Sequence, residues 1–387
     1  MRVLWLCSWY PNPLSPFDGD FIQRHAKAVA AYTAVTVFYM AQSGETVNVI
    51  KDSLVEKKED NLKEKIIFFR FTKTGLRWID KLIYNILYFR AYKKAIKSYI
   101  RDEGMPDIVH VHVPMKAGMI ARWMRRRWKA SYIISEQSSM YSKAATDSFF
   151  KKNAWHRHKI KKIFRNADVV TNVSAAVGET LKVLFNLPIV KVIHNTVNTD
   201  FFYYKETASS KFRFIHVSGL NHQKNVEGIL RTISRLSDLR KDFEVVIVGD
   251  ISPALRKMID DLKLNSIVHC TGEISYEEVA LQMQNASAFV MFSRHENFPC
   301  VMVEALSCGL PVIGTAIGGV PEAINESNGM IASSENESEL LSAMNTMMNE
   351  YQKYNREKIA FDARGKYSYS AIGKQFFDLY NEIARAD

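Results

Sequence analysis

A short apolar run, a polar loop and a proline-started helical pattern follow one another between Ala288 and Gly309. The run AFVMF has no polar interruption, which is typical of a parallel strand buried on both faces. Pro299 is expected at the first helical position, where its missing N–H leaves no partner unsatisfied. The amides that follow would point outward at the positive end of the helix dipole, so the stretch predicts a seat for a phosphate group. Strand–loop–helix units of this kind build α/β folds.

Two carboxylates flank this predicted seat. Glu296 stands in the loop, and Glu304 stands on the helix among apolar neighbours. A carboxylate in apolar surroundings needs a specific partner to offset its desolvation. Taken alone, the pair would also fit a solvated loop residue and a surface charge.

The same alternation of strands and helices runs along the whole chain. At 387 residues the chain is too long for one ordinary core. A polar, serine-bearing segment at 203–211 reads as a linker between two α/β domains. The predicted strands are 2–6, 35–39, 66–71, 107–113, 132–135, 169–173 and 190–193 before it, and 212–217, 243–248, 267–270, 288–292 and 311–314 after it. Residues 42–65 are predicted to be a surface excursion.

Two histidines lie on the predicted strand 107–113. His110 and His112 alternate with valines, so both side chains point to one face. A strand histidine is usually a satisfied core residue, and His110 is interpreted in that way. His112 stands at the carboxyl end, which faces the ligand crevice of an open α/β sheet.

The turns after the first strand of each predicted domain give different signals. G-x-G-x-x-G is absent after residues 2–6, which argues against a dehydrogenase. Lys224 lies in SGLNHQKN, just before a helix that starts near Val226. A helix dipole disfavours a cation at this position, so Lys224 indicates an anionic ligand.

The motifs FSRHENFPCVMVEALSCG and CGLPVIGTAIGGVPEAI recur together in retaining glycosyltransferases, and the chain resembles family 4 of these enzymes nearly end to end. The resemblance implies an α/β fold called GT-B, with two doubly wound Rossmann-like domains facing a central cleft. The acceptor-side domain would comprise residues 1–203 and 368–387, with the last helix crossing back onto it. Residues 204–367 would bind the nucleotide sugar.

The resemblance also implies residue roles. His112 would contact the donor sugar, Glu296 would touch and orient it, and Lys224 would stabilise the leaving diphosphate. Glu304 would bind the ribose hydroxyls, and Gly19 would let the backbone approach the diphosphate, although an ordinary turn glycine fits equally well. The implied donor-binding set is Gly19, Lys224, Arg294, Asn297, Phe298, Pro299 and Glu304.

No D-x-D stands at the end of a predicted strand, so metal-independent catalysis without a cofactor is implied. One departure from the family pattern is Gly219, where an arginine is often found. Arg294 or His222 would have to replace that phosphate contact. A glycine common at the exit from the first domain is Thr196 here.

Charge is distributed unevenly. The net charge is +11, and residues 1–200 contain 33 Lys or Arg and 17 Asp or Glu, giving +16. This asymmetry indicates an anionic partner, and the absence of a nucleic-acid-binding signature favours a membrane surface over a nucleic acid. Basic and aromatic residues interleave in 78–100 and in ARWMRRRWKA, although a core-facing helix and a solvated basic face fit as well. The membrane or acceptor side is assigned to Arg122, Arg125, Arg126 and Arg127.

Four cysteines without paired spacing indicate a reducing, cytoplasmic setting. No run approaches the roughly 20 apolar residues of a spanning helix. We therefore predict a peripheral protein on the inner face of the cytoplasmic membrane. It would move a sugar from a UDP-, GDP- or ADP-sugar to a saccharide or lipid-linked saccharide during synthesis of a cell-surface polysaccharide. The alternatives are a sugar-nucleotide epimerase of the same fold, a non-catalytic nucleotide-binding protein and a nucleic-acid binder.

Overall fold

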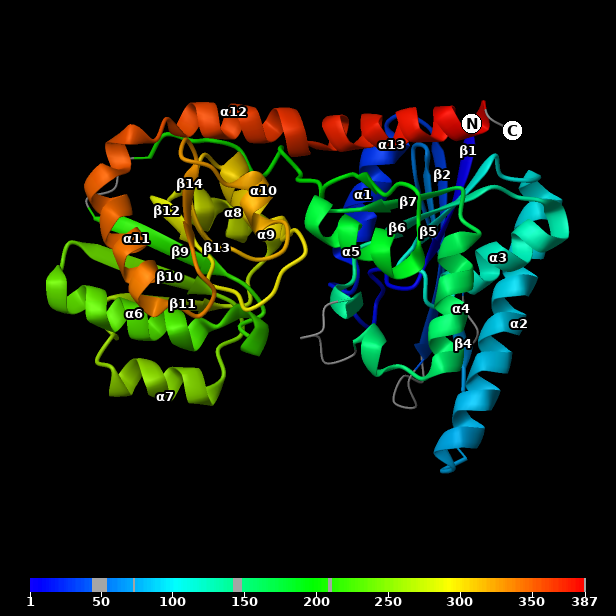
Figure 1. The fold of residues 1–387 in the computed structure, drawn as a ribbon, viewed down its shortest axis with the longest axis horizontal. Coiled ribbons are helices and arrows are strands. Elements are labelled where there is room, and N and C mark those ends of the chain that lie inside the picture. Colours follow the sequence, from blue (N-terminus) through cyan, green and yellow to red (C-terminus); the bar gives the residue numbers. More distant parts are fainter. Residues whose placement is uncertain (44–53, 72–73, 142–147, 208–210, 386–387) are drawn as a thin grey trace. The chain divides into compact units, whose positions relative to one another are not determined.

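A computed structural model of the protein describes residues 1–43, 54–71, 74–141, 148–207 and 211–385. These residues form two compact units, each with its own sheet (Figure 1). Unit 1 comprises residues 1–173, 178–193 and 372–387, and unit 2 comprises residues 174–177 and 194–371.

The change of unit falls at residue 194, whereas the predicted boundary is residue 203. Hydrogen bonds within unit 2 account for this difference. The Asn195 side chain donates to the Phe298 carbonyl at 2.6 Å, and the Val197 amide donates to the Tyr367 carbonyl at 2.8 Å. These bonds hold residues 194–203 to unit 2. Part of the predicted linker, residues 208–210, lies outside the described residues.

Unit 1 contains an eight-stranded sheet in the order β3-β4-β2-β1-β5-β6-β7-β8. Its strands are β1 (Arg2–Cys7), β2 (Ala34–Ser43), β3 (Leu54–Glu59), β4 (Leu62–Arg70), β5 (Ile108–His112), β6 (Tyr132–Glu136), β7 (Val169–Asn172) and β8 (Lys191–Val192). All neighbours are parallel except β3 and β4, which pair antiparallel. The predicted surface excursion is therefore wrong for residues 54–65, which belong to this edge hairpin, while residues 44–53 lie outside the described part of the chain.

The helices of unit 1 are α1 (Asp20–Ala30), α2 (Arg77–Glu103), α3 (Ala117–Trp128), α4 (Ala154–Arg165), α5 (Ala175–Phe185) and α13 (Tyr369–Ala384), the last two starting in unit 2. Two short 3₁₀ turns, η1 (Ser139–Tyr141) and η2 (Phe149–Lys151), precede α4. β1 is buried along Val3–Cys7, because helices cover both faces of the sheet. α1 and α13 pack on one face, while α2, α3 and α4 lie on the other. Gly373 allows α13 to cross α1, since a Cβ there would meet the Ala28 carbonyl oxygen at 2.2 Å.

Unit 2 contains a six-stranded parallel sheet in the order β11-β10-β9-β12-β13-β14. Its strands are β9 (Phe212–Val217), β10 (Phe243–Val248), β11 (Val268–Gly272), β12 (Ala288–Val290), β13 (Val312–Thr315) and β14 (Gly329–Ala332). Its helices are α6 (Val226–Leu239), α7 (Pro253–Asp261), α8 (Tyr276–Gln284), α9 (Cys300–Ser307), α10 (Val320–Ala323), α11 (Glu337–Glu350) and α12 (Arg356–Tyr367), with 3₁₀ turns η3 (His222–Lys224) and η4 (Tyr351–Lys353).

α6 shows how the sequence specifies this unit. Its fully buried residues Ile229, Leu230, Ile233 and Leu236 repeat at helical spacing and pack against strand residues such as Phe214. The Asn225 side chain caps α6 by accepting a hydrogen bond from the Gly228 amide at 3.3 Å. This cap fixes where the turn after β9 ends and where the helix begins.

Within the part of the chain that the structure describes, no helix is long and apolar enough to span a bilayer.

Candidate functional site

The strand order places a topological switch point in each unit. In unit 2 the chain moves from β9 to β10 on one side of the sheet and later returns to β12 on the other side. In unit 1 the corresponding pair is β1 and β5. Ligands of open α/β sheets bind outside the carboxyl ends of the strands at such points. The predicted site residues of each unit follow these strands.

The switch point of unit 2 joins Lys224 to Glu296. The Lys224 ammonium donates to a Glu296 carboxylate oxygen at 2.6 Å, and the two side chains are 18% and 6% exposed. The residues are 72 positions apart in the sequence and come together because the loops after β9 and β12 are neighbours. A carboxylate this buried requires a charged partner, and Lys224 supplies it.

Further hydrogen bonds tie the two loops together. The Gln223 side chain donates to the His295 carbonyl at 2.8 Å, and the Arg294 amide donates to the Gln223 carbonyl at 2.8 Å. The Arg294 guanidinium forms ion pairs with Glu227 and Glu335, each at 3.0 Å. Arg294 therefore cross-links the loop to α6 and to the turn before α11.

The ion pairs of Arg294 affect which residue can replace the arginine that the family often carries at the position of Gly219. Of the two predicted substitutes for the missing arginine, Arg294 is already held by two carboxylates, whereas the side chain of His222 is exposed. A Cβ at Gly219 would meet no atom within 4 Å among the described residues, so the turn has room for a side chain there.

Two glycines, Gly318 and Gly319, pack closely against the loop before α9. The Gly319 amide donates to the Asn297 carbonyl at 2.7 Å. Gly318 has φ +51°, and a Cβ there would lie 1.9 Å from the Glu296 carbonyl oxygen. Only glycine permits this approach, so the GG pair of the sequence supports the loop that carries Glu296.

α9 starts one residue later than predicted. Pro299 has φ −68° and ψ 128°, which makes it the N-cap, and the first helical residue is Cys300. Phe298, which precedes it, is buried with its ring stacked on His194 at a centroid distance of 4.3 Å. The proline and the stacked ring together fix the direction in which α9 leaves the loop.

Glu304 lies on the buried side of α9 and is 4% exposed. The Tyr276 hydroxyl, from the first residue of α8, donates to a Glu304 oxygen at 3.0 Å. Sequence reasoning required a partner for this carboxylate but could not identify it, since Tyr276 and Glu304 come from different helices. The two carboxylates thus occupy different environments: Glu296 faces a cation, and Glu304 faces a hydroxyl.

His112 ends β5 at the switch point of unit 1 and is fully buried. Its ring stacks on Trp5 at a centroid distance of 4.0 Å, and among the described residues neither ring nitrogen has a hydrogen-bond partner. Burial lowers the pKa of His112 well below its usual range, and the neighbouring His110 and His25 lower it further. His112 is therefore a neutral imidazole near neutral pH.

His110 is different. One of its ring nitrogens is hydrogen-bonded to the Tyr380 hydroxyl and the other to the Ser135 hydroxyl, both at 2.7 Å. It is a satisfied core residue that links β5 to α13, as predicted.

Gly19 is the N-cap of α1 and has φ +68°. A Cβ at this position would lie 2.7 Å from the backbone carbon of Trp9. The local backbone alone therefore requires glycine, whatever ligand lies nearby.

The arginine run of α3 lies at the other end of the sheet of unit 1. α3 ends at Trp128, shortly before β6 begins, so its last turn is at the amino edge, whereas His112 is at the carboxyl edge. Arg125 is paired with Asp168 at 2.6 Å, and Arg126 and Arg127 are exposed. Arg122, one turn earlier, is half-buried. These arginines belong to unit 1, the predicted acceptor-side domain, but they do not lie at its ligand-binding edge.

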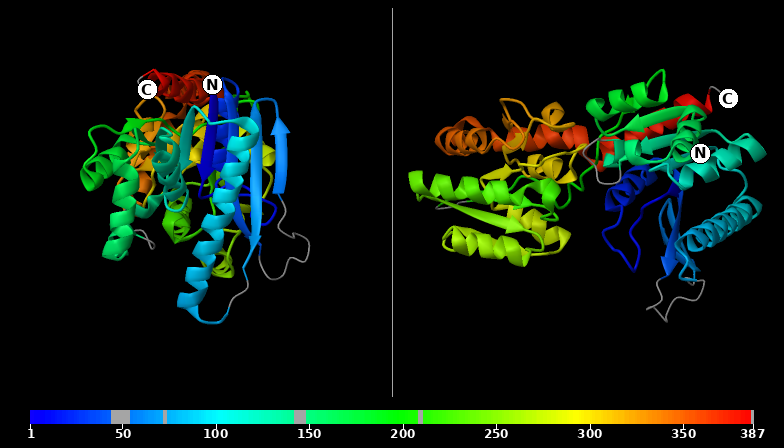
Figure 2. Two further views of the ribbon diagram at one scale, coloured as in Figure 1. Left: turned by 90° about the vertical axis from the view of Figure 1, so that its right-hand side faces the viewer. Right: turned by 60° about the horizontal axis from the view of Figure 1, so that its bottom comes forward.

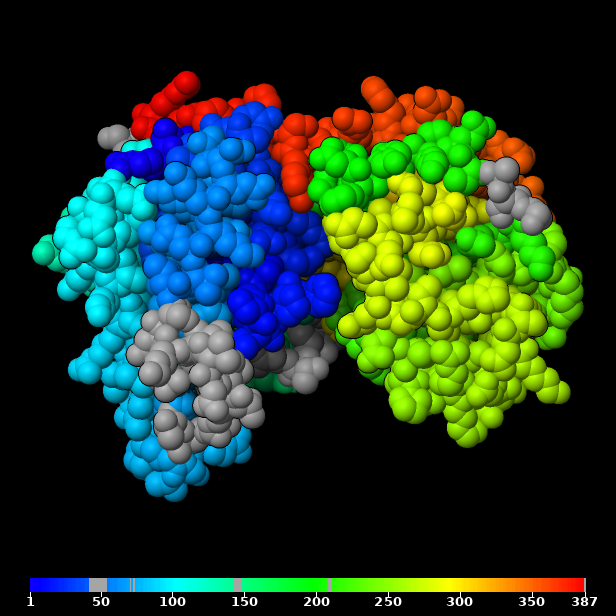
Figure 3. Space-filling view, turned by 180° about the vertical axis from the view of Figure 1, so that it is seen from behind, coloured from blue at the N-terminus to red at the C-terminus, as the bar shows by residue number. Residues whose placement is uncertain are grey.

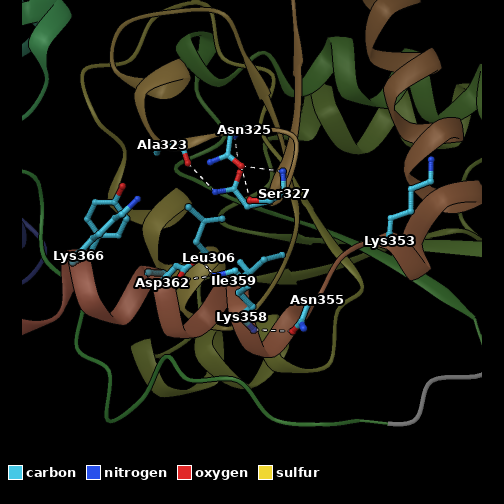
Figure 4. A pocket seen from close by; sticks show the side chains of 13 residues that line it. Leu306, Ala323, Asn325, Ser327, Lys353, Asn355, Lys358, Ile359, Asp362 and Lys366 are labelled. Carbon is cyan, nitrogen blue, oxygen red and sulfur yellow. Dashed lines mark hydrogen bonds and ion pairs between the residues drawn. The ribbon is translucent and has the colours of Figure 1, made fainter.

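A cavity of about 260 Å³ lies at the amino edge of unit 2, between α12 and the loop before β14 (Figure 4). Its walls include Leu306 near the end of α9 and the lysines Lys358 and Lys366 of α12. The asparagines on the loop side are hydrogen-bonded within their own loop. Because Glu296 and Lys224 lie at the carboxyl edge, this cavity is separate from the switch point.

Among the residues described, no group of three or more His, Cys, Asp or Glu is arranged to hold a metal ion.

Two family models match successive parts of the chain. The model described as glycosyltransferase family 4 matches residues 29–201, and the model described as glycosyl transferases group 1 matches residues 201–361.

Curated relatives cover most of the chain at low identity. An uncharacterised glycosyltransferase of Methanocaldococcus jannaschii is 25% identical over 79% of this chain and 84% of its own length. TuaC of Bacillus subtilis, a putative teichuronic acid biosynthesis glycosyltransferase, is 24% identical over 83% of this chain and 82% of its own length.

Solved structures share the fold. Sucrose-phosphate synthase of Thermosynechococcus elongatus aligns over the whole of both chains with a TM-score of 0.79 and 17% identity. HepE of Anabaena, solved with UDP-glucose, aligns over 99% of this chain and all of its own with a TM-score of 0.72 and 16% identity. The two parallel-sheet units therefore have the predicted GT-B fold.

Proposed function

Because the chain belongs to glycosyltransferase family 4, we propose that it moves a sugar from a nucleoside diphosphate to an acceptor hydroxyl with retention of anomeric configuration. The observation that carries this proposal is the buried Lys224–Glu296 pair at the switch point of unit 2. It combines a cation suited to a diphosphate with a carboxylate suited to sugar hydroxyls.

Unit 2 holds the donor. The leaving diphosphate gains negative charge as the glycosidic bond breaks, and the Lys224 ammonium and the first-turn amides of α9 stabilise that charge. Both groups are fixed before the donor arrives, because Glu296 orients the ammonium and the Pro299 cap orients the helix. No metal ion or cofactor is needed in this scheme.

The two carboxylates bind different parts of the donor. Glu296 accepts hydrogen bonds from the transferred sugar and orients it. Glu304 accepts hydrogen bonds from the ribose hydroxyls, and the Tyr276 hydroxyl keeps its carboxylate in position. Asn297 and Phe298 shape the loop between them, and Gly19 belongs to the backbone that approaches the diphosphate.

The acceptor supplies the nucleophile. Its hydroxyl attacks on the face from which the diphosphate departs, and a leaving phosphate oxygen takes the proton, so no protein side chain serves as covalent nucleophile. His112 hydrogen-bonds the transferred sugar as a neutral imidazole, which suits a polyol because it presents one donor and one acceptor.

The acceptor that we propose is a lipid-linked saccharide at the inner face of the cytoplasmic membrane, within synthesis of a cell-surface polysaccharide. The charge of +16 over residues 1–200 supports an anionic membrane partner. The relationship to TuaC, whose description names teichuronic acid biosynthesis, supports a surface polymer.

A donor panel tests the proposal. The thermal midpoint of the protein is measured with UDP-, GDP- and ADP-sugars, and a bound donor at 100 times its Kd adds about 2.7 kcal/mol of stability. Product analysis with the stabilising donor then shows whether a glycoside forms and with which anomeric configuration. Inversion would refute retention, and loss of activity with EDTA would refute the metal-free scheme.

Two controls separate the alternatives. An epimerase would convert the donor without any acceptor, and a non-catalytic protein would bind it without turnover.

A further inference from the structure

Unit 1 carries a stripe of exposed apolar side chains on the first half of α2. Trp78, Leu82 and Ile86 are 71%, 55% and 43% exposed, and they recur every four residues. Residues four apart lie on one helical face, so the three side chains form a continuous surface. A stripe of this size on a long helix is unusual for a surface that meets only water.

The opposite face of α2 anchors the helix to the sheet. Tyr84 packs against Phe69 at a centroid distance of 5.2 Å, and the Lys116 ammonium lies 4.0 Å from the Tyr84 ring centre. Leu82 and Ile86 are each two positions from Tyr84, which is about 200° around a helix. The anchoring therefore turns the apolar stripe away from unit 1.

A second exposed group lies before and at the start of α4. Phe150 and Trp155 are 40% and 65% exposed, and the Lys159 ammonium lies 3.2 Å above the Trp155 ring. Between residues 150 and 165 the chain has seven Lys or Arg and no Asp or Glu. The segment therefore combines exposed aromatic rings with an excess of basic over acidic residues.

The two groups lie at the same end of unit 1. α2 follows β4 and α4 follows β6, and both strands run in the same direction, so both helices begin at the carboxyl edge. Figure 1 and the left panel of Figure 2 show both helix starts at the lower end of unit 1. Figure 3 shows the first turns of α2 projecting from the body of the unit at this end. His112 ends β5 at the same edge.

We propose that the starts of α2 and α4 form one surface that binds the headgroup region of an anionic bilayer. Trp78, Leu82 and Ile86 enter the interface, and the cations around Trp155 contact lipid phosphates. Exposed aromatic and aliphatic side chains beside lysines are the composition that favours this region of a membrane. The charge of the segment is complementary to an anionic surface, whereas an apolar protein partner would leave the cations unmatched.

This inference rests on the proposed function in one respect, the lipid-linked acceptor. A bilayer at the carboxyl edge of unit 1 would present the saccharide of such an acceptor at the edge where His112 lies. The inference also replaces the arginine run of α3 as the contact, because that run lies at the amino edge with Arg125 paired.

Sedimentation with vesicles tests the surface. The full chain is mixed at low salt with vesicles of phosphatidylglycerol and phosphatidylcholine, and with phosphatidylcholine alone. We expect binding to the anionic vesicles that weakens as salt rises, because exposed charges are screened. We also expect the triple change Trp78→Ser, Leu82→Ser and Ile86→Ser to weaken it by an order of magnitude or more.

A second variant tests the α4 part. Changing Lys151, Lys152 and Lys159 to Ser should weaken binding to anionic vesicles and flatten its salt dependence. Two matched controls should bind like the wild type: Phe361→Ser, which removes a side chain that is 75% exposed in unit 2, and the joint change of Arg125, Arg126 and Arg127 to Ser.

The outcomes are distinct. The inference is overturned if the wild type stays in the supernatant with anionic vesicles, if the α2 variant binds as the wild type does, or if the α3 variant alone loses binding. Transfer to a soluble acceptor mimic is measured in parallel. If the α2 variant still transfers sugar to the soluble mimic, the variant is folded. If the wild type transfers no sugar to the soluble mimic, the proposed function is refuted, whatever the vesicle result.

Discussion

The two switch points differ in how they accommodate buried titratable groups. In unit 2 the buried Glu296 faces Lys224 at 2.6 Å, so an opposite charge compensates its desolvation. In unit 1 burial lowers the pKa of His112 well below its usual range and raises the pKa of Glu136, at the end of β6, to about 7. Among the described residues neither group forms an ion pair, and burial favours the neutral form of each. This difference supports our proposal that unit 2 binds the charged part of the donor and unit 1 contacts its neutral part.

This difference divides the proposed reaction between the units. A diphosphate requires fixed positive charge, which the switch point of unit 2 provides through Lys224. Sugar hydroxyls require hydrogen-bonding groups without net charge, and the neutral His112 provides two ring nitrogens. Substitutions in each unit test this division.

Replacing Lys224 should have the largest effect. Lys224→Ala should lower kcat/KM by about 10²–10³-fold, the scale expected for loss of one preorganised group that stabilises developing charge. The variant also leaves Glu296 buried without its cation, so its melting temperature should fall.

The double variant Lys224→Met with Glu296→Gln separates the two effects. It should recover the melting temperature, because no unpaired charge remains, but it should not recover activity. Activity restored together with stability would mean that Lys224 has only a structural role.

The second prediction concerns the titration of Glu136. Its carboxylate accepts hydrogen bonds from the Gln137 and Ser138 amides at 2.9 and 2.7 Å and from the Tyr141 hydroxyl at 3.0 Å, but burial outweighs these bonds. Burial raises the pKa of Glu136 in the folded state from its ordinary value of 4.5 to about 7, so the folded state holds this proton more tightly than the unfolded state. The stabilising contribution is present below pH 4.5 and is lost as pH rises to about 7.

Glu136→Gln should therefore gain stability relative to the wild type across this interval. At 1.36 kcal/mol per pKa unit the gain is about 3 kcal/mol. Chemical denaturation of both proteins at pH 4.5, 6 and 8 measures it. Equal pH dependence in the two proteins would show that the carboxyl has the same pKa in the folded and unfolded states.

The third prediction separates the two carboxylates of unit 2. Glu304→Ala should raise the KM for the nucleotide sugar, since the loss of a hydrogen bond to a charged group costs about 1.5–3 kcal/mol. Glu296→Ala should instead lower kcat and kcat/KM together. Tyr276→Phe removes the hydroxyl that donates to Glu304 and should raise the same KM by a smaller factor. A pure KM effect at Glu296 would mean that the two roles are exchanged.

The candidate site residues that the sequence singled out belong to local patterns. Glu296, Glu304 and Lys224 belong to motifs within single loops or helix starts, and the alternation of apolar runs with helical patterns was sufficient to predict two parallel-sheet units. The pairing of Lys224 with Glu296 was not predictable, because it depends on β9 and β12 being neighbours across 72 positions.

Contacts between distant elements explain the other differences. Tyr276 reaches Glu304 from a separate helix, and Arg294 pairs with Glu227 of α6 and with Glu335 in the turn before α11. The arginine run of α3 was assigned to the acceptor side from its composition, and composition does not show which edge of the sheet a helix end reaches. The same holds for the exposed stripe of α2. The sequence showed that the helix contains aromatic and basic residues, but it did not show which face packs on the sheet.

The smallest expected effect comes from Gly219, where the family often carries an arginine. A Cβ at this position would meet nothing within 4 Å among the described residues, and the Arg294 guanidinium is engaged with two carboxylates. Gly219→Arg should therefore be accommodated in the fold and should add a charge-assisted contact to the donor diphosphate. We expect the donor Kd to fall by about tenfold or less, the scale of one such contact at a partly exposed site.

Gly219→Ala should leave the Kd unchanged, whereas Gly318→Ala, whose Cβ would lie 1.9 Å from the Glu296 carbonyl oxygen, should disrupt donor binding. Calorimetric titration with the donor distinguishes these results. An unchanged or higher Kd in the arginine variant would show that position 219 does not face the diphosphate, and the charged ligand assigned to unit 2 would then have to bind through Lys224 and α9 alone.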